Sequence, residues 1–314
     1  MPLPLFWNVI INPNALNNKN TSLWELVKLK LSNKGYTFNE FFSPSQKKCE
    51  EIVSKLIKEG HTNFTVVGGD GTLNEVVNAL LKSASFSENI LLALIPSGNG
   101  NDWAKTHNIS TGTSALVDMF LFGEVRPHDI GKVIVNKNGI LSERYFINIA
   151  GLAFDAEVII RVNKSLKYSF GNKFIYLKNL FLSLLSNKPI DCGFILNDTT
   201  FEMPVFSIAV GICKYNGGGM MPVPMADPHD GLLDVVIIEP MNLFEILTQL
   251  PKLYKGKHIG YKKIHHYRTF NISIAPKQTM FAEVEGEIVG DGTFEIMSVP
   301  QKVNVLVPFD NKTI

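Results

Sequence analysis

The chain has 314 residues, a formal net charge of +1, 45% apolar residues and 19% charged residues. This composition excludes intrinsic disorder, and the near-zero charge argues against a protein that binds nucleic acid by neutralising its phosphates. The length predicts two domains, each with its own core.

The apolar stretches are too short or too interrupted for a membrane-spanning helix, which needs roughly 18 or more apolar residues. One of them, 174–185, contains Lys178 and Asn179, and we interpret it as a buried helix. No basic segment precedes the first apolar residues, so we expect no signal peptide. Three isolated cysteines without a CxxC pair favour a reducing, cytoplasmic compartment.

Residues 1–130 alternate between two patterns. Short apolar runs rich in β-branched residues predict strands at 7–11, 64–67 and 91–95. Apolar residues at helical spacing predict helices over 49–57, 73–81 and 115–120. Such alternation is typical of parallel strands joined by right-handed crossovers, so we expect an α/β domain over residues 1–130.

From residue 131 onward the pattern consists mostly of strands. A hairpin is expected over 132–149, with its turn at Lys137-Asn138-Gly139. A helix is predicted at 243–253. Further strands are predicted at 192–196, 205–212, 233–238, 271–275, 282–284, 294–299 and 303–307. We expect an antiparallel β-sandwich over 131–302, with the segment of about 303–314 returning to the first domain.

The most informative motif is Gly68-Gly69-Asp70-Gly71-Thr72, at the junction of a predicted strand and a predicted helix. Its three glycines let the backbone turn sharply and bring N–H groups close to a ligand, and the helix N-terminus favours an anion. Thr72 and Glu75 fit a capping box. A carboxylate beside a phosphate needs a cation between them, so Asp70 indicates a Mg²⁺–nucleotide site. The alternative is an ordinary glycine-rich turn with Asp70 as a solvated cap.

A second polar loop, from Pro96 to Asp102, follows the strand predicted at 91–95. In a parallel sheet both loops lie at the carboxyl ends of their strands, where such folds bind ligands. A third carboxylate, Asp129, stands where the helical pattern gives way to strands. On its own, Asp129 is equally consistent with a turn.

These segments resemble the nucleotide loops of the diacylglycerol kinase catalytic-domain family, which groups bacterial lipid kinases with sphingosine and ceramide kinases. The Gly-Gly-Asp-Gly-Thr motif alone is shared with NAD kinases and phosphofructokinase-like folds. The combination becomes specific through further matches along the chain, at Tyr145–Gly151, Phe154–Glu157, Gly217–Met220, Asp230–Val235 and Glu285–Glu287.

The resemblance implies a Rossmann-like nucleotide domain, similar to that of NAD kinases and phosphofructokinases, then a β-sandwich domain, with the site in the cleft between them. It also implies that Asp70, Asp102 and Asp129 hold Mg²⁺, partly through water. The ATP-binding residues that it implies are Asn12, Gly68, Gly69, Asp70, Gly71, Thr72, Asn74, Glu75, Ser97, Gly98, Asn99, Gly100 and Asn101.

By the same resemblance, Glu287 acts as the general base, which accepts a proton as a lipid hydroxyl attacks the γ-phosphate of ATP. Asp230 and Asp234 match a region that binds a second, structural Mg²⁺ in some relatives. The alternative for these two is a turn carboxylate and an edge-strand carboxylate. His265 and His266 lie in a basic stretch, which we interpret as a solvated strand face.

Two positions depart from the family pattern. The first loop usually reads Asn-Pro-x-Ser/Ala-Gly, whereas here it is Asn12-Pro13-Asn14-Ala15-Leu16. The missing glycine removes the reason to expect a backbone contact from this loop to phosphate. The usual Asp-Gly-Glu is Glu285-Gly286-Glu287, which keeps the base but lengthens the side chain of its neighbour.

We therefore expect an ATP- and Mg²⁺-dependent lipid kinase that acts on diacylglycerol or a related lipid in phospholipid biosynthesis. One alternative is another acceptor, such as a sphingoid base or phosphatidylglycerol. A second is a regulator that binds lipid or nucleotide without catalysis. An NAD kinase fits less well, because the Asp-Gly-Leu-Leu-Asp motif would be unexplained. We expect a cytoplasmic protein, peripheral at the inner membrane face, that takes its lipid from the membrane surface. A homodimer is compatible with this expectation, and a nucleic-acid partner is not.

Overall fold

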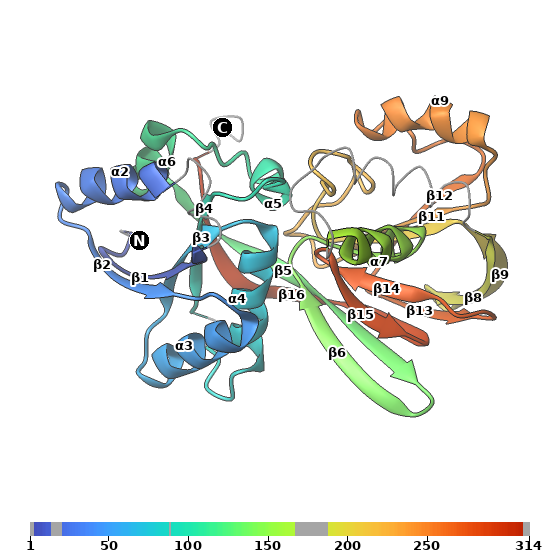
Figure 1. The fold of residues 1–314 in the computed structure, drawn as a ribbon, viewed down its shortest axis with the longest axis horizontal. Helices are drawn as coiled ribbons and strands as arrows, with labels where there is room; N and C mark the ends of the chain where they lie inside the picture. The colour runs from blue at the N-terminus through green and yellow to red at the C-terminus, as the bar shows by residue number, and fades with distance from the viewer. Residues whose placement is uncertain (1–2, 14–20, 88, 167–187, 310–314) are drawn as a thin grey trace. The chain divides into compact units, whose positions relative to one another are not determined.

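The structure, a computed structural model, describes residues 3–13, 21–87, 89–166 and 188–309. It divides into two compact units (Figure 1). The first comprises Met1–Ile130, Gly217–Gly219 and Pro300–Ile314, and the second comprises Gly131–Asn216 and Met220–Val299. The two units are therefore each built from separate stretches of the chain.

The first unit alternates strands and helices. Its elements are β1 (Phe6–Ile11), α2 (Thr21–Ser32), β2 (Thr37–Phe42), α3 (Gln46–Lys58), β3 (Asn63–Gly68), α4 (Asp70–Lys82), β4 (Leu91–Pro96), α5 (Asp102–Thr106) and α6 (Thr113–Phe122). The strands are parallel, in the order β2-β1-β3-β4. The end of β16 (Thr293–Val307) completes this sheet, where Asn304 and Val305 pair in parallel with β4.

The order of the strands places helices on both faces of this sheet. The crossover from β1 to β2 runs in the opposite direction to that from β2 to β3, so right-handed crossovers put α2 and α3 on opposite faces. Helix α6 packs against α2, and α4 packs against α3 (Figure 1). All six residues of β4 are buried, as expected for a strand covered on both faces.

The second unit is mainly antiparallel. Its elements are β5 (Glu124–Lys137), β6 (Ile140–Phe146), β7 (Ile149–Ala153), α7 (Phe154–Leu166), β8 (Ile190–Leu196), β9 (Thr199–Val205), β10 (Ser207–Gly211), β11 (Leu233–Ile238), α9 (Leu243–Leu253), β12 (Ile264–Thr269), β13 (Asn271–Pro276), β14 (Phe281–Val284) and β15 (Glu287–Asp291). Parts of β5 and β16 belong to each unit. One sheet has the order β12-β11-β10-β7-β14-β15, and the other contains β16-β13-β8-β9 and the β5–β6 hairpin. Helix α7 packs against β7 and β14.

The expected fold class, an α/β unit and a mainly antiparallel β unit, is confirmed. The helix predicted at 243–253 has the same bounds in α9. The strand predicted at 205–212 is wrong in one respect, because Phe206 separates β9 from β10 and the two pair with different neighbours. The strands predicted at 294–299 and 303–307 are one strand, β16. The sequence patterns do not predict α2, β2, β7, α7, β9 or β15.

Two expectations from composition can be compared with the structure. Cys49, Cys192 and Cys213 are buried, and none of the three forms a disulfide within the described part of the chain. Among the residues described, no helix combines the length and the apolar character needed to cross a membrane. The helix predicted at 174–185 lies outside the described residues.

Candidate active site

Two glycine loops lie side by side at the carboxyl ends of β3 and β4. The strand register pairs Gly68 with Pro96, and the N–H of Ser97 donates to the carbonyl of Gly68 at 2.9 Å. The backbones then touch, since a Cβ built on Gly98 would lie 2.6 Å from the Cα of Gly69. Only residues without a Cβ permit this approach. The glycines predicted to bind phosphate therefore also allow the two loops to meet.

The tip of the second loop lies next to two carboxylates. Asn101 adopts a left-handed conformation, with φ of 50°. Its Oδ1 accepts the N–H of Gly98 and its Nδ2 donates to the carbonyl of Gly98, both at 2.9 Å. A Cβ built on Gly100 would lie 3.2 Å from Oδ2 of both Asp70 and Asp102. Any larger residue at Gly100 would crowd these two oxygens.

Asp70 is the first residue of α4, and its carboxylate caps α5. Oδ2 accepts the N–H of Asp102 at 3.1 Å, and Oδ1 accepts the N–H of Trp103 at 2.9 Å. Burial raises the pKa of Asp70 above its ordinary value, the two N–H donors lower it, and the negative charge of Asp102 raises it further. A cation beside this carboxylate would offset both the burial and the repulsion.

Asp102 is also buried, and two donors hold it. Its Oδ1 accepts from Nζ of Lys105 at 2.7 Å, and its Oδ2 accepts the N–H of Gly218 at 2.7 Å. Gly218 belongs to the short segment Gly217–Gly219 of the first unit. The sequence analysis assigns no role to Lys105, and it gives no sign that Gly218 would reach Asp102 across 116 residues.

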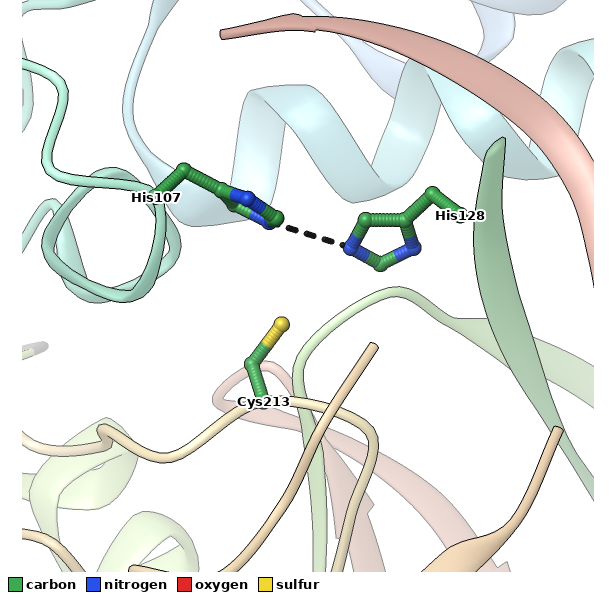
Figure 2. A group of neighbouring side chains, drawn as sticks. All are labelled: His107, His128 and Cys213. Carbon is green, nitrogen blue, oxygen red and sulfur yellow. Dashed lines mark hydrogen bonds between the residues drawn. The ribbon is translucent and has the colours of Figure 1, made fainter. Parts of the chain in front are cut away.

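Asp129 is fully buried in β5, and its neighbour His128 connects this strand to α5. Figure 2 shows the imidazoles of His107 and His128 facing each other, with 3.2 Å between their Nε2 atoms. Trp103 Nε1 donates to the same Nε2 of His128 at 3.2 Å, so that atom is an acceptor. The proton of His128 is therefore assigned to Nδ1, which donates to the carbonyl of Asp129 at 2.5 Å. This network holds α5, which begins at Asp102, against the strand that carries Asp129.

The predicted capping box is wrong. Helix α4 begins at Asp70 with Gly69 as its N-cap, and among the described residues no side chain caps this end. Thr72 therefore lies inside the first turn, where its Oγ1 accepts from Nδ2 of Asn12 at 2.9 Å. Asn12 follows β1, so this bond joins the chain after β1 to the first turn of α4, which follows β3; the strand order reverses between these two strands.

The remaining residues predicted to bind nucleotide lie on α4 and the second loop. Asn74 is buried in α4, and its backbone carbonyl and Oδ1 accept from Nδ2 of Asn78 at 2.9 and 3.2 Å. The others are Gly71 and Glu75 on α4, and Ser97 and Asn99 on the loop after β4. Asn14, Ala15 and Leu16, which depart from the family pattern, lie outside the described residues.

Asp70 and Asp102 fit a hard divalent cation. Mg²⁺ prefers carboxylate oxygens and usually keeps several waters. The two Oδ2 atoms flank the same position at Gly100, and the half-buried carboxylate of Asp70 and the buried one of Asp102 repel each other. Because their oxygens already accept N–H groups, coordination partly through water suits them. The structure thus brings two of the three predicted ligands together and places Asp129 on β5 of the same unit.

The predicted base, Glu287, is the first residue of β15, and 47% of its side chain is exposed. Arg144 of β6 donates from a terminal guanidinium nitrogen to its Oε2 at 2.8 Å. The preceding turn has positive φ at Glu285 (51°) and Gly286 (84°). Oε1 of Glu285 accepts the N–H of Asn148 at 2.7 Å, which fixes this turn. The chain thereby presents a partly exposed carboxylate that is paired with a cation.

Near this turn lie two further carboxyl groups, the buried Glu283 and the half-buried Asp155, to which the sequence patterns assign no role. Oε2 of Glu283 accepts the N–H of Gly286 at 2.7 Å, and burial raises the pKa of Glu283 to about 8. Burial also raises the pKa of Asp155, to about 7. The hydroxyl of Ser207, which donates to Oδ2 of Asp155 at 3.2 Å, lowers this pKa in part. A Cβ built on Gly151 would lie 2.6 Å from Oε1 of Glu283. The one signal in the sequence is the family match at Asp155.

Asp230 and Asp234 are paired with basic side chains of β12. Arg268 donates to Oδ2 of Asp230, and its Nε lies 3.7 Å from Oδ2 of Asp234. His266 Nε2 donates to Oδ1 of Asp234 at 2.6 Å, and Oδ1 of Asp230 accepts the N–H of Leu232 at 2.9 Å. A structural Mg²⁺ here would have to displace Arg268, and its binding stays a prediction. The interpretation of a solvated face is wrong for His266, which contacts a buried carboxylate.

Comparison with known proteins covers nearly the whole chain. Residues 7–133 match the model of the diacylglycerol kinase catalytic domain, and residues 149–307 match that of the YegS C-terminal NAD kinase beta sandwich-like domain. The chain belongs to the diacylglycerol kinase catalytic-domain family. Membership confirms the expected family and makes the chain a lipid kinase with an alcohol group as acceptor. It also implies ATP as the phosphoryl donor.

Individual relatives of this lipid kinase agree with the assignment. A diacylglycerol kinase from Staphylococcus saprophyticus is 25% identical over 304 residues, which cover 97% of this chain and 96% of the relative. A crystal structure of a diacylglycerol kinase from Bacillus anthracis superposes with a TM-score of 0.71 at 16% identity, covering 99% of this chain and 98% of the other. Yeast NADH kinase shares the fold with a TM-score of 0.50 at 9% identity, over 100% of this chain and 86% of that one.

Proposed function

We propose that this lipid kinase transfers the γ-phosphate of ATP, with Mg²⁺, to the free hydroxyl of diacylglycerol. The observation that carries the proposal is the carboxylate pair Asp70 and Asp102 beside two touching glycine loops at the carboxyl ends of β3 and β4. The names of full-length relatives support diacylglycerol as the acceptor. Acting at the inner membrane face, the enzyme would return diacylglycerol to phospholipid biosynthesis.

In this proposal the first unit binds the nucleotide. The N–H groups of Gly69–Thr72 and Asn99–Asn101 hold the phosphates, and the N-terminus of α4 adds its dipole. The N–H groups of Ser97 and Gly98 instead hold the two loops in shape, because they donate to Gly68 and Asn101. Asp70, Asp102 and Asp129 would hold the metal, partly through water. When bound, Mg²⁺ neutralises the charge that develops on the transferred phosphoryl group. Lys105 restrains Asp102 through its 2.7 Å contact.

Glu287 accepts the proton of the attacking hydroxyl. The contact with Arg144 orients the Glu287 carboxylate. Glu283 acts only as a positioning residue, because it accepts the N–H of Gly286 next to Glu287. Protonated at neutral pH, it stabilises the turn without placing a second negative charge beside the base.

The proposal is tested by following label from γ-³²P-ATP into a panel of acceptors: diacylglycerol, a sphingoid base, phosphatidylglycerol and NAD. We expect Mg²⁺-dependent labelling of diacylglycerol above all others. Preferential labelling of another acceptor would contradict the proposed substrate. Binding of ATP without any transfer would favour the regulator that lacks catalysis.

A further inference from the structure

Helix α9 presents an apolar stripe that stays exposed among the residues that the structure describes. The side chains of Leu243, Phe244, Leu247 and the C-cap residue Tyr254 are 39%, 76%, 55% and 52% exposed. At about 100° per residue, all four fall within an arc of roughly 100° on the helix surface. Four large apolar side chains on one open arc form a patch rather than scattered exposure.

The opposite face of α9 already holds the helix on its unit. Gln249 is buried, and Ile246 and Leu250 are half-buried. Glu245 completes a capping box with Asn242 and accepts from the hydroxyl of Tyr261 at 2.8 Å. The apolar stripe is therefore additional to the apolar face on which the helix packs.

Basic residues are concentrated in the segment that carries this stripe. The segment 241–263 contains five lysines and one acidic residue, a net charge of +4 in a chain whose total is +1. The acidic residue, Glu245, pairs with Lys263 at 2.9 Å. The other four lysines, all exposed, are Lys252, Lys255, Lys257 and Lys262. The rest of the chain is consequently net negative, and positive charge is concentrated in α9 and the segment that follows it.

We propose that α9 docks onto the surface of an anionic lipid bilayer, with the stripe of Leu243, Phe244, Leu247 and Tyr254 inserted at the headgroup boundary and the lysines on anionic lipids. An apolar face flanked by lysines is the pattern of interfacial helices. Anionic headgroups attract juxtamembrane lysines. A second copy of the chain is a poorer occupant, because pairing two such faces would bring two charges of +4 together.

A role of this surface in catalysis rests on the lipid kinase function proposed above. The binding of α9 to bilayers does not depend on that function. The test is sedimentation of the full chain with vesicles of phosphatidylglycerol and phosphatidylcholine, compared with phosphatidylcholine alone. We expect Phe244→Ser to lower affinity for the anionic vesicles at least tenfold. Lys252→Gln should lower it about fivefold and reduce its dependence on salt. Phe122→Ser, at a 70% exposed phenylalanine that ends α6, is the matched control and should bind as the unaltered protein does.

Three results would overturn the proposal. The first is that Phe244→Ser binds the anionic vesicles as tightly as Phe122→Ser. The second is a dimer, detected by light scattering, that Phe244→Ser dissociates, which would assign the stripe to a second copy. The third is a much lower melting temperature of Phe244→Ser than of Phe122→Ser, which would show that the stripe packs within the chain.

The same variants separate this proposal from the kinase function. We expect Phe244→Ser to lose activity toward long-chain diacylglycerol in anionic vesicles and to keep activity toward a water-soluble short-chain diacylglycerol. Equal losses on both substrates would contradict a docking role for α9. If the unaltered protein binds vesicles but phosphorylates neither diacylglycerol, the docking surface stands and the kinase proposal fails.

Discussion

Replacing Glu283 by Gln should make the second unit more stable at alkaline pH. The carboxyl group is 3% exposed, and its Oε2 accepts the N–H of Gly286. Burial raises its pKa from 4.5 to about 8, and the charge of Asp155 contributes in the same direction. Gln keeps the shape and an acceptor oxygen but cannot ionise. The substitution therefore removes the cost of a buried negative charge and keeps the contact with the turn.

The direction of the effect follows from the shift in pKa. The folded state holds the proton of Glu283 more tightly than the unfolded state does, so this stabilisation is complete below about pH 4.5 and is lost as the pH rises through about 8. A shift from 4.5 to about 8 corresponds to at most about 5 kcal/mol. We therefore expect the free energy of unfolding of the unaltered protein to fall by several kcal/mol relative to Glu283→Gln between pH 5 and 9.

The measurement is urea unfolding followed by far-UV circular dichroism at pH 5, 6, 7, 8 and 9. The control is Glu295→Gln, at an exposed position on β16. We expect the control and the unaltered protein to have the same free energy of unfolding at every pH. The free energy of unfolding of Glu283→Gln should rise relative to both as the pH increases. Parallel pH profiles for Glu283→Gln and the unaltered protein would refute the burial of an ionisable carboxyl at this position.

Three further substitutions test the site and its surroundings. Glu287→Gln should lower kcat by 10² or more, the range expected for loss of a general base, and leave the Kd for ATP in calorimetry unchanged; a pure loss of ATP binding would contradict the assignment. Gly98→Ala should destabilise the protein by about 1–3 kcal/mol in urea unfolding, because its Cβ would lie 2.6 Å from the neighbouring loop. The control, Gly71→Ala, should leave the stability unchanged, because the space around Gly71 is open. Added Mg²⁺ should raise the melting temperature of Arg268→Ser more than that of the unaltered protein, because the substitution removes the ion pair with Asp230. An equal rise in both proteins would show that Arg268 does not compete with a cation.

The parts of the fold that sequence predicts well are those in which one pattern repeats within a single element. The apolar spacing over 73–81 and 243–253 identifies α4 and α9, because each helix buries one face. The same spacing gives no helix boundary. The motif of Thr72 and Glu75 predicts a capping box at Thr72, whereas the helix already begins at Asp70, in contact with α5.

Contacts between distant segments account for what sequence analysis does not find. Gly218 reaches Asp102 across 116 residues, and Arg268 reaches Asp230 across 38. Neither pairing leaves a local pattern in the chain. Glu283 lies in a short strand whose alternation does not reveal how deeply the carboxyl is buried, so the shift in its pKa could be found only from the packing around it.

The most direct test of the account is the rate at which Asp70→Asn transfers label from γ-³²P-ATP to diacylglycerol. The variant keeps an oxygen that can accept an N–H group of α5, so we expect an unchanged circular dichroism spectrum. Loss of the charge that holds Mg²⁺ should lower transfer at least a thousandfold, or about 4 kcal/mol. Asp118→Asn, at an exposed aspartate of α6, should transfer at the rate of the unaltered protein. Unchanged transfer by Asp70→Asn would contradict the assignment of the two glycine loops and their carboxylates as the phosphoryl-transfer site.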